Sequence, residues 1–276
     1  MRSMADRGRL LSRPAVCILL AGLYALSCAS VASAAGVDTI VHDPLESSRW
    51  RYMVAQHFRD APVVFDERVQ VLVPDHAQDP QATPVQIRVQ GLNDVTQIRV
   101  IADASAHSRV LDYFPANAAP SIGFSFEVAQ ATPLRAAVRT GDGVWHIGGA
   151  WVDGQGGGCA APSVTPAASA DLAFEGRIEA RSWARANDRQ RLKLRVVVPR
   201  QTSDIATGST AVAEEITVRD TQGRLQARLV PGSPLARASL FTLDIPSREA
   251  LQIEAGDDQG NRYRTRVAMN AEDEAP

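Results

Sequence analysis

Cysteine is scarce in this chain. Three occur among 276 residues, at Cys17, Cys28 and Cys159. The first two lie in an N-terminal stretch built like a secretory signal, with four arginines, an apolar run over 15–26 and Ala32-Ser33-Ala34 as a small-residue cleavage site. We expect cleavage after Ala34. Cys159 is then the one cysteine of the mature protein, which excludes an internal disulfide and leaves a reactive thiol, an intermolecular link or a buried residue, burial being least expected beside glycines.

Long apolar runs and an excess of positive charge are also lacking. Outside the N-terminal stretch no segment approaches the ~20 apolar residues of a membrane helix, so we predict a soluble periplasmic protein without a membrane span. Removing the signal changes the formal net charge from −2 to −5. This mild acidity argues against nucleic-acid binding, which needs a concentrated basic face. A lipoprotein signal ending at Cys28 is a competing interpretation, although Leu26 stands one position from the usual pattern.

Catalytic and cofactor-binding motifs are missing as well. The five histidines are scattered, and the chain has no HExxH, no His/Cys cluster at metal-ligand spacing, no nucleophile elbow and no GxxxxGK[ST]. Cys159 and His146 could form a thiolate–imidazole pair, or bind copper, but a nucleophile must be held rigidly near its base. Neither a metal nor a cofactor is predicted, and the chain is not expected to be an enzyme.

The most informative stretch is Gly154-Gln155-Gly156-Gly157-Gly158-Cys159-Ala160-Ala161-Pro162. Three glycines before a thiol leave the backbone nearly unrestricted, and the Ala-, Ser- and Pro-rich sequence that follows is typical of an exposed connector. A thiolate on such an arm can attack an oxidised sulfur and hold the product covalently. The stretch therefore predicts either a cargo-bearing arm or a linker with an incidental cysteine.

Short alternating strands occupy most of the remaining sequence. Apolar residues recur at every second position and stop at Pro, Gly, Asn or Asp, with no convincing helix between the strands, which indicates β-sandwiches. In the first half they are Val69–Val73, Val85–Val89, Ile98–Val100, Phe124–Val128, Leu134–Val138 and Val144–Ile147. In the second half they are Leu192–Val198, Ile216–Val218, Leu225–Leu229, Phe241–Ile245, Leu251–Ala255 and Tyr263–Val267.

The two halves align with each other at nearly constant spacing, which predicts two copies of one sandwich. The matched landmarks are Pro74 with Pro199, Ile98–Val100 with Ile216–Val218, Phe124–Phe126 with Phe241–Leu243, and Asp142 with Asp258. We interpret Asp257 and Asp258 simply as turn formers.

One helix is expected before the strands. Apolar side chains have helical spacing over 43–58, and Asp43 followed by Pro44 is a suitable N-cap and first residue. The helix should dock on the domain that follows. Trp50 and Tyr52 are expected either to pack against that domain or to mark a surface for a partner.

These residues resemble a known family. The first half, whose last strand runs into a Gly-rich segment with one cysteine, resembles SoxY, the periplasmic sulfur carrier of thiosulfate oxidation, and the second half resembles its partner SoxZ. The closest resemblance is to a fused form, the quinoprotein dehydrogenase-associated SoxYZ-like carrier. It rests on the motifs at 43–45, 61–66, 130–133, 142–152 and 156–159.

The resemblance implies an all-β fold of two Ig-like sandwiches in tandem. The implied parts are a signal peptide (1–34), an N-terminal helical segment (35–60), a SoxY-like sandwich (61–155), a carrier arm and linker (156–172) and a SoxZ-like sandwich (173–276). Cys159 would be the covalent attachment site, and Gly156, Gly157 and Gly158 the swinging arm. Unlike the family's Gly-Gly-Cys-Gly-Gly arm, this one has glycines only before the cysteine and is tethered at both ends.

The implied partners are periplasmic redox enzymes, either Sox-type sulfur-oxidising enzymes or a PQQ-dependent dehydrogenase and its cytochrome c. Two other functions stay open. The protein could be a structural or assembly factor for the dehydrogenase in which Cys159 is dispensable, or a thiol hydrolase.

Overall fold

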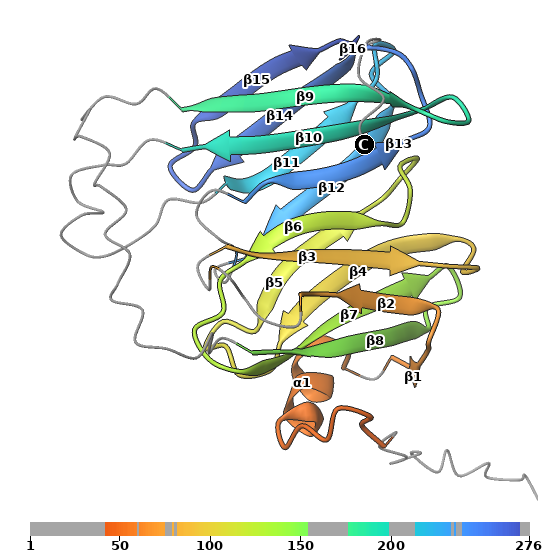
Figure 1. Ribbon diagram of the computed structural model, residues 1–276, viewed down its shortest axis with the longest axis vertical. Coiled ribbons are helices and arrows are strands. Elements are labelled where there is room, and N and C mark those ends of the chain that lie inside the picture. The colour runs from red at the N-terminus through yellow and green to blue at the C-terminus, as the bar shows by residue number, and fades with distance from the viewer. Residues whose placement is uncertain are drawn as a thin grey trace, which may run out of the picture. The chain divides into compact units, whose positions relative to one another are not determined.

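A computed structural model describes residues 42–59, 61–74, 79, 82–153, 176–198, 213–232, 235 and 239–270. These residues form sixteen strands and one helix, so the predicted all-β class is confirmed (Figure 1). They belong to one compact unit. Among them, no helix has the length and apolar character needed to cross a membrane.

The strands form two sheets, and each sheet contains strands from both halves of the sequence. The first sheet has the order β1-β8-β7-β4-β5-β12-β11-β14-β15. Its strands are β1 (Val63–Phe65), β4 (Val95–Ala102), β5 (Arg109–Phe114), β7 (Thr132–Thr140), β8 (Trp145–Val152), β11 (Ala213–Arg219), β12 (Leu225–Pro231), β14 (Leu251–Asp257) and β15 (Arg262–Val267).

The second sheet has the order β16-β9-β10-β13-β6-β3-β2. Its strands are β2 (Val69–Leu72), β3 (Thr83–Val89), β6 (Ile122–Phe126), β9 (Arg177–Arg185), β10 (Arg189–Val197), β13 (Phe241–Ile245) and β16 (Met269–Asn270). Neighbouring strands are antiparallel except at two edges, where β1 joins β8 and β16 joins β9 in parallel.

The strand order repeats, as the sequence predicts. The run β2 to β8 in the first half has the same neighbours as β9 to β15 in the second. Three predicted landmarks fall on equivalent elements, in β4 and β11, in β6 and β13, and in the turns after β7 and β14. The remaining predicted match, of Pro74 with Pro199, is wrong. Pro74 follows β2, whereas Pro199 follows β10, whose counterpart is β3, because the loops between these strands differ in length.

The two sandwiches are joined strand to strand. β5 pairs with β12 and β6 pairs with β13, both antiparallel, so each sheet continues from one half into the other. One hydrophobic core follows this junction and includes Tyr113 and Ile122 from the first half and Leu229 and Leu243 from the second. Alternation explains how it forms: in β3, Thr83, Val85 and Ile87 are buried and the intervening side chains are more exposed.

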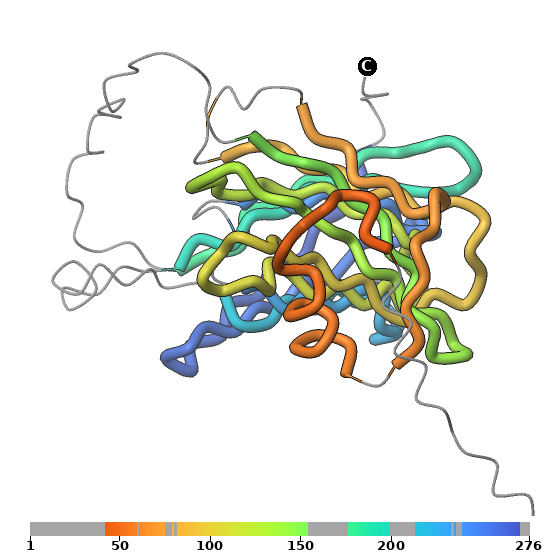
Figure 2. Tube along the Cα trace, turned by 90° about the horizontal axis from the view of Figure 1, so that it is seen from below, coloured from red at the N-terminus to blue at the C-terminus, as the bar shows by residue number. Residues whose placement is uncertain are grey.

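The helix is shorter than expected. α1 spans Trp50–His57, and its N-cap is Arg49, not Asp43. The Asp43 carboxylate instead accepts hydrogen bonds from the backbone N–H groups of Leu45 (3.1 Å) and Ser47 (2.8 Å), which stabilise a turn ahead of the helix. Figure 2 shows this N-terminal segment lying across the strands of the first half.

Helical period explains which side of α1 is buried. Trp50, Met53 and the following Phe58 pack on Ile101 of β4 and on Ala137, Trp145 and Ile147 of β7 and β8. Tyr52 lies on the other side and is 58% exposed. Trp50 therefore packs, and of the two aromatic residues only Tyr52 is available to a partner.

Candidate functional site

The predicted site residues Gly156, Gly157, Gly158 and Cys159 lie outside the described residues, as do Cys17, Cys28 and the segment 1–34. The structure describes the strands on either side of the arm. β8 runs up to it and β9 begins after it, on the same side of the two sheets (Figure 1). The described part of the candidate site is therefore the frame of strands that carries the arm.

The hairpin that leads to the arm has a tightly specified turn. The Asp142 carboxylate accepts hydrogen bonds from the Thr140 hydroxyl (2.6 Å) and the Val144 N–H (3.1 Å), and Gly143 has a φ of +88°. That backbone region favours glycine. This turn fixes the register of β8 on β7 from Trp145 to Val152.

Two glycines in β8 are required by close approaches. A Cβ on Gly148 would lie 1.7 Å from the Val69 carbonyl oxygen of β2, and one on Gly149 would lie 2.8 Å from Leu45 Cδ1. The first contact closes the edge of the sandwich, and the second seats the N-terminal segment on β8. The pair Gly148-Gly149 is therefore explained by packing.

The C-terminal end of β8, just before the arm, carries an exposed aromatic side chain. Trp151 is 53% exposed, and its indole N–H donates a hydrogen bond to the Leu45 carbonyl oxygen (3.1 Å). The next residue, Val152, is buried in the core. The arm thus departs from a strand whose final two residues are anchored on opposite faces.

A buried ionic cluster holds the N-terminal segment to this strand pair. Arg135 of β7 has no exposed side-chain surface and donates hydrogen bonds to Asp43 (2.7 Å, twice) and to Asp103 (3.0–3.1 Å). Its guanidinium lies 4.4 Å from the centre of the Trp50 ring. Such a cluster stabilises the fold only while all partners are present.

The cluster shifts the acidity of its members. Burial on its own would raise the pKa of Asp43, but the hydrogen bonds from Arg135, Ser47 and Leu45 outweigh it, and the net effect is a lowered pKa. Burial opposes the charge of Arg135 too, and the two carboxylates more than compensate, so its pKa is raised. Asp43 and Arg135 are therefore both charged at neutral pH.

His146 is held on the opposite side of β8. Its Nδ1 lies 2.8 Å from an Asp66 carboxylate oxygen, and Asp66 also pairs with Arg68 (2.7 Å). The pKa of Asp66 is lowered, mainly by hydrogen bonds from Arg68. Burial opposes this shift, and the hydrogen bond with His146 adds to it. Six residue-to-residue steps along the strand, at about 3.3 Å each, separate His146 from Val152. Its ring is thus committed to a structural contact near the start of β8.

A second histidine contacts a hydroxyl. His57 Nε2 lies 2.7 Å from Ser108 Oγ, and the backbone carbonyl oxygen of His57 accepts from Arg99 (3.0 Å). Burial, followed by the positive charge of Arg99, lowers the pKa of His57. No carboxylate hydrogen-bonds to its ring among the described residues, so the pair lacks the third member of a catalytic triad. Among these residues no group of three His, Cys, Asp or Glu could hold a metal ion.

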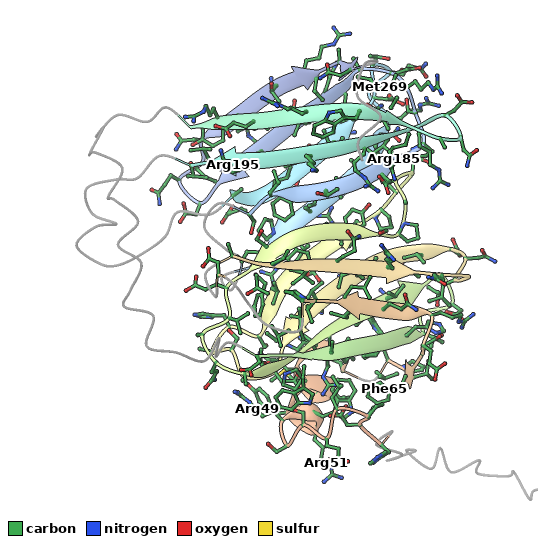
Figure 3. The ribbon with its side chains drawn as sticks, viewed as in Figure 1. Arg49, Arg51, Phe65, Arg185, Arg195 and Met269 are labelled. Carbon is green, nitrogen blue, oxygen red and sulfur yellow. The ribbon has the colours of Figure 1, made fainter. Side chains whose placement is uncertain are left out.

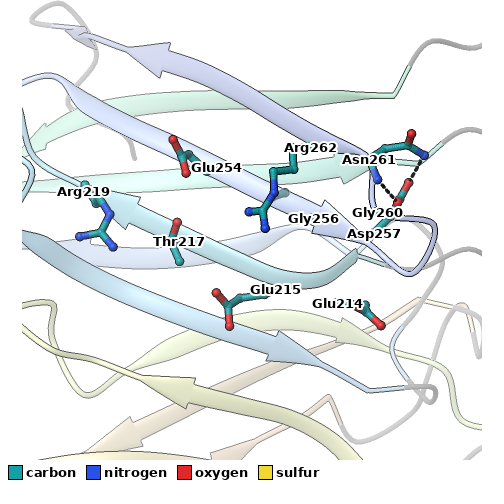
Figure 4. A pocket seen from close by; sticks show the side chains of 11 residues that line it. Glu214, Glu215, Thr217, Arg219, Glu254, Gly256, Asp257, Gly260, Asn261 and Arg262 are labelled. Carbon is teal, nitrogen blue, oxygen red and sulfur yellow. Dashed lines mark hydrogen bonds between the residues drawn. The ribbon is translucent and has the colours of Figure 1, made fainter.

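A hollow of about 470 Å³ lies on the outer face of β11, β14 and β15, far along the sheet from β8 (Figure 4). Its walls carry both signs of charge, including Glu215, Arg219, Glu254 and Arg262. At its end, Asp257 accepts hydrogen bonds from the N–H groups of Gln259 and Asn261, which confirms Asp257 as a turn former. The buried Asp257 carboxylate is occupied by its own turn, and the mixed charge of the other walls favours no particular ligand.

Arg135 and Asp103 were missed by the sequence analysis. The available signal was Arg135, a charged residue inside the apolar run Leu134–Val138. Seven of the other eight residues of β7 are buried, on both faces of the strand. A cation in such a run indicates a buried partner. The identity of that partner, 92 positions away for Asp43, could not be read from the spacing.

The family comparison matches the first half and the start of the arm. Residues 54–159 match the family model described as "Sulfur oxidation protein SoxY". This segment is a SoxY family domain. The matched region extends from α1 through β8 and ends at Cys159, so the strand frame of the SoxY domain and the predicted attachment residue fall in one match. No curated protein matches the chain.

Solved structures share only weak similarity with the chain. The sulfur carrier protein SoxY from Chlorobium limicola f thiosulfatophilum is 19% identical over 38% of this chain and 96% of its own, with a TM-score of 0.34. A β-glucuronidase from Parabacteroides merdae is 6% identical over 78% of this chain and 24% of its own, with a TM-score of 0.22. A β-glycosidase from Bacteroides vulgatus is 7% identical, covering 74% and 25%, with a TM-score of 0.22. These scores carry no functional argument.

Proposed function

We propose that this protein is a non-enzymatic carrier that holds a sulfur-containing intermediate covalently on Cys159 and presents it to partner enzymes. One observation carries the proposal: the SoxY family match ends at Cys159. Gly156, Gly157 and Gly158 supply the arm. The described frame supports this role, because the arm starts from a strand that is fixed on both faces by Trp151 and Val152.

The chemistry required of the protein is modest. A Cys159 thiolate attacks a central sulfur of tetrathionate, the new S–S bond gives Cys–S–S–SO₃⁻, and thiosulfate leaves with the electron pair of the broken S–S bond. No other oxidant is needed, because tetrathionate itself is reduced to the thiosulfate that leaves. The carrier contributes a reachable thiolate and no further catalytic group.

Tetrathionate loading tests this proposal. We expect intact-mass analysis of the reduced, purified protein to show addition of one S₂O₃ unit after tetrathionate treatment, removed again by dithiothreitol. Cys159→Ser should show no addition, because no other cysteine follows the predicted cleavage site. An unmodified wild-type protein, or equal addition to Cys159→Ser, would contradict the proposal.

Export and partners extend the same proposal. The signal-like sequence of residues 1–34 supports action in the periplasm. The resemblance of the second half to SoxZ supports a fused carrier that needs no separate partner subunit. Sox-type enzymes, or a PQQ-dependent dehydrogenase and its cytochrome c, would then be the proteins that load and unload Cys159.

The exposure of Tyr52 and Trp151 favours a second candidate, an assembly factor for the quinoprotein dehydrogenase. Dehydrogenase activity in cells that carry Cys159→Ala separates the two functions. A carrier loses its contribution with the thiol, whereas an assembly factor keeps it. Tyr52→Ala with Trp151→Ala should have the reverse effect if assembly is the function.

A further inference from the structure

The outer face of the β9–β10 hairpin is unusually cationic. Cross-strand partners share one face of a sheet. The buried side is defined by Ser182, Gln190, Leu192 and Leu194, which have no exposed surface. The other side therefore displays Arg177, Glu179, Arg181, Trp183 and Arg185 from β9 and Arg189, Arg191, Lys193, Arg195 and Val197 from β10. We call these ten residues the basic face; Figure 3 labels Arg195 and Arg185, which lie toward its two ends.

Few carboxylates neutralise the basic face. Glu179 pairs with both Arg177 and Arg195, and Asp244 of the neighbouring β13 pairs with Arg191 (2.8 Å). The remaining four cations, Arg181, Arg185, Arg189 and Lys193, form no ion pair with any described residue. In a chain with a formal net charge of −2, this is a marked local excess of positive charge.

The cations are also arranged unfavourably for the isolated fold. Arg181 lies directly opposite Lys193, and Arg185 directly opposite Arg189. Like charges at paired positions destabilise a sheet. Lys193 lies 5.4 Å from the centre of the Trp183 ring, which relieves part of the repulsion. A sheet face that holds two like-charge pairs is complementary to a negatively charged surface.

The size of the face indicates a macromolecular partner. Two paired strands of nine residues extend about 30 Å, which is the scale of a protein–protein contact and much larger than a small anion. Arginine and tryptophan are the residue types that dominate binding energy at such contacts. The face also begins at Arg177, the first strand residue after the segment that contains Cys159.

We propose that the basic face docks a carboxylate-rich surface of the partner protein that exchanges cargo with Cys159. This inference rests on the proposed carrier function. Docking at β9 holds the partner beside the end of the arm and raises the effective concentration of the thiol at its target. Opposite charge steers the encounter and makes it depend on salt.

The test uses the full chain with the pair Arg181→Gln/Lys193→Gln. This variant removes a like-charge pair, so it should fold with unchanged or higher thermal stability. Arg262→Gln/Arg266→Gln is the matched control, because it removes two cations that are exposed on β15 of the other sheet. The probe is a fluorescent polyglutamate peptide, titrated at low and at physiological salt, with a single-stranded oligonucleotide of equal length beside it.

We expect the wild type to bind polyglutamate at low salt, and Arg181→Gln/Lys193→Gln to weaken binding about tenfold. The control should change it less than about twofold. Tetrathionate loading of Cys159 should be unchanged in both variants, so failure of docking remains distinguishable from failure of the carrier function. Equal weakening in the two variants would overturn the proposal.

The same titration tests a nucleic acid as another occupant of the basic face, and one further variant tests the acidic C-terminal segment. Tighter binding of the oligonucleotide than of polyglutamate, lost in Arg181→Gln/Lys193→Gln, would overturn the proposal in favour of a nucleic-acid site. β16 pairs with β9 at Ser182 and Trp183, and Glu272, Asp273 and Glu274 follow it. If polyglutamate bound only after all three were changed to their amides, the face would serve this acidic segment, and docking would be contradicted.

Discussion

Arg135→Ala is expected to lower the free energy of unfolding by about 3–5 kcal/mol. The substitution leaves the Asp43 and Asp103 carboxylates without their shared cation, in a site where Arg135 itself has no exposed surface. It also removes the group that packs on Trp50 and so loosens the N-terminal segment. Urea unfolding followed by tryptophan fluorescence measures the loss.

Arg139→Ala is the matched control for this experiment. It makes the same substitution on the same strand, but Arg139 is exposed and its one aromatic contact, to Trp145, is long at 5.9 Å. We expect a change within about 1 kcal/mol. Equal losses in the two variants would show that the buried cluster is not what stabilises this region.

The pH dependence separates lost charge from lost packing. In the wild type the pKa of Asp43 is lowered, so its contribution to stability is complete above about pH 4, the unfolded value, and is lost as the pH falls through the lower folded value. In Arg135→Ala the unpaired buried carboxylates should have raised pKa values. The variant should therefore gain stability between pH 7 and pH 5, where the wild-type cluster does not change. A constant difference over that range would contradict the electrostatic explanation.

Cutting the chain between its two halves is expected not to separate them. A protease site inserted after Ala170 would break the covalent connection, while the β5–β12 and β6–β13 pairs and the common core remain. An interface that continues two sheets and one core resembles a domain core cut in half, as in obligate complexes. We expect a dissociation constant below about 1 μM.

Gel filtration of the cut protein measures this association. The two fragments should elute together at the volume of the intact chain and separate only in denaturing urea, which verifies that cleavage is complete. Two peaks in native buffer would contradict the continuous sheets. Fragments that associate but no longer accept sulfur at Cys159 would indicate that the loading reaction needs the connected arm.

The strands could be predicted from the sequence, because the alternation of apolar and polar residues is a local signal. Residues such as Val85 and Ile87 or Leu251 and Ile253 alternate with exposed neighbours and are buried as expected. The repeated order of strands was also accessible, from the matching positions of β4 with β11 and β6 with β13. The joining of the halves was not, because strand pairs such as Tyr113 with Leu229 depend on the shape of both folded halves.

Residues with two uses were the hardest to predict. Asp43 and Pro44 have the pattern of a helix start, but the Asp43 carboxylate binds a turn and Arg135, and α1 begins only at Trp50. Trp50 and Tyr52, two positions apart, fall on opposite sides of α1 for purely helical reasons. The spacing of apolar residues predicted which side of the helix is buried. It could not predict where the helix starts, because Asp43 is bound by Arg135, 92 positions away in the sequence.

The carrier function is tested most directly by the mass of the protein isolated from its native compartment without reductant. We predict a sulfur-containing adduct that maps to the peptide with Cys159, disappears on reduction and is absent from cells that carry Cys159→Ser. A uniformly free thiol, or an adduct that persists in Cys159→Ser, would contradict the carrier function.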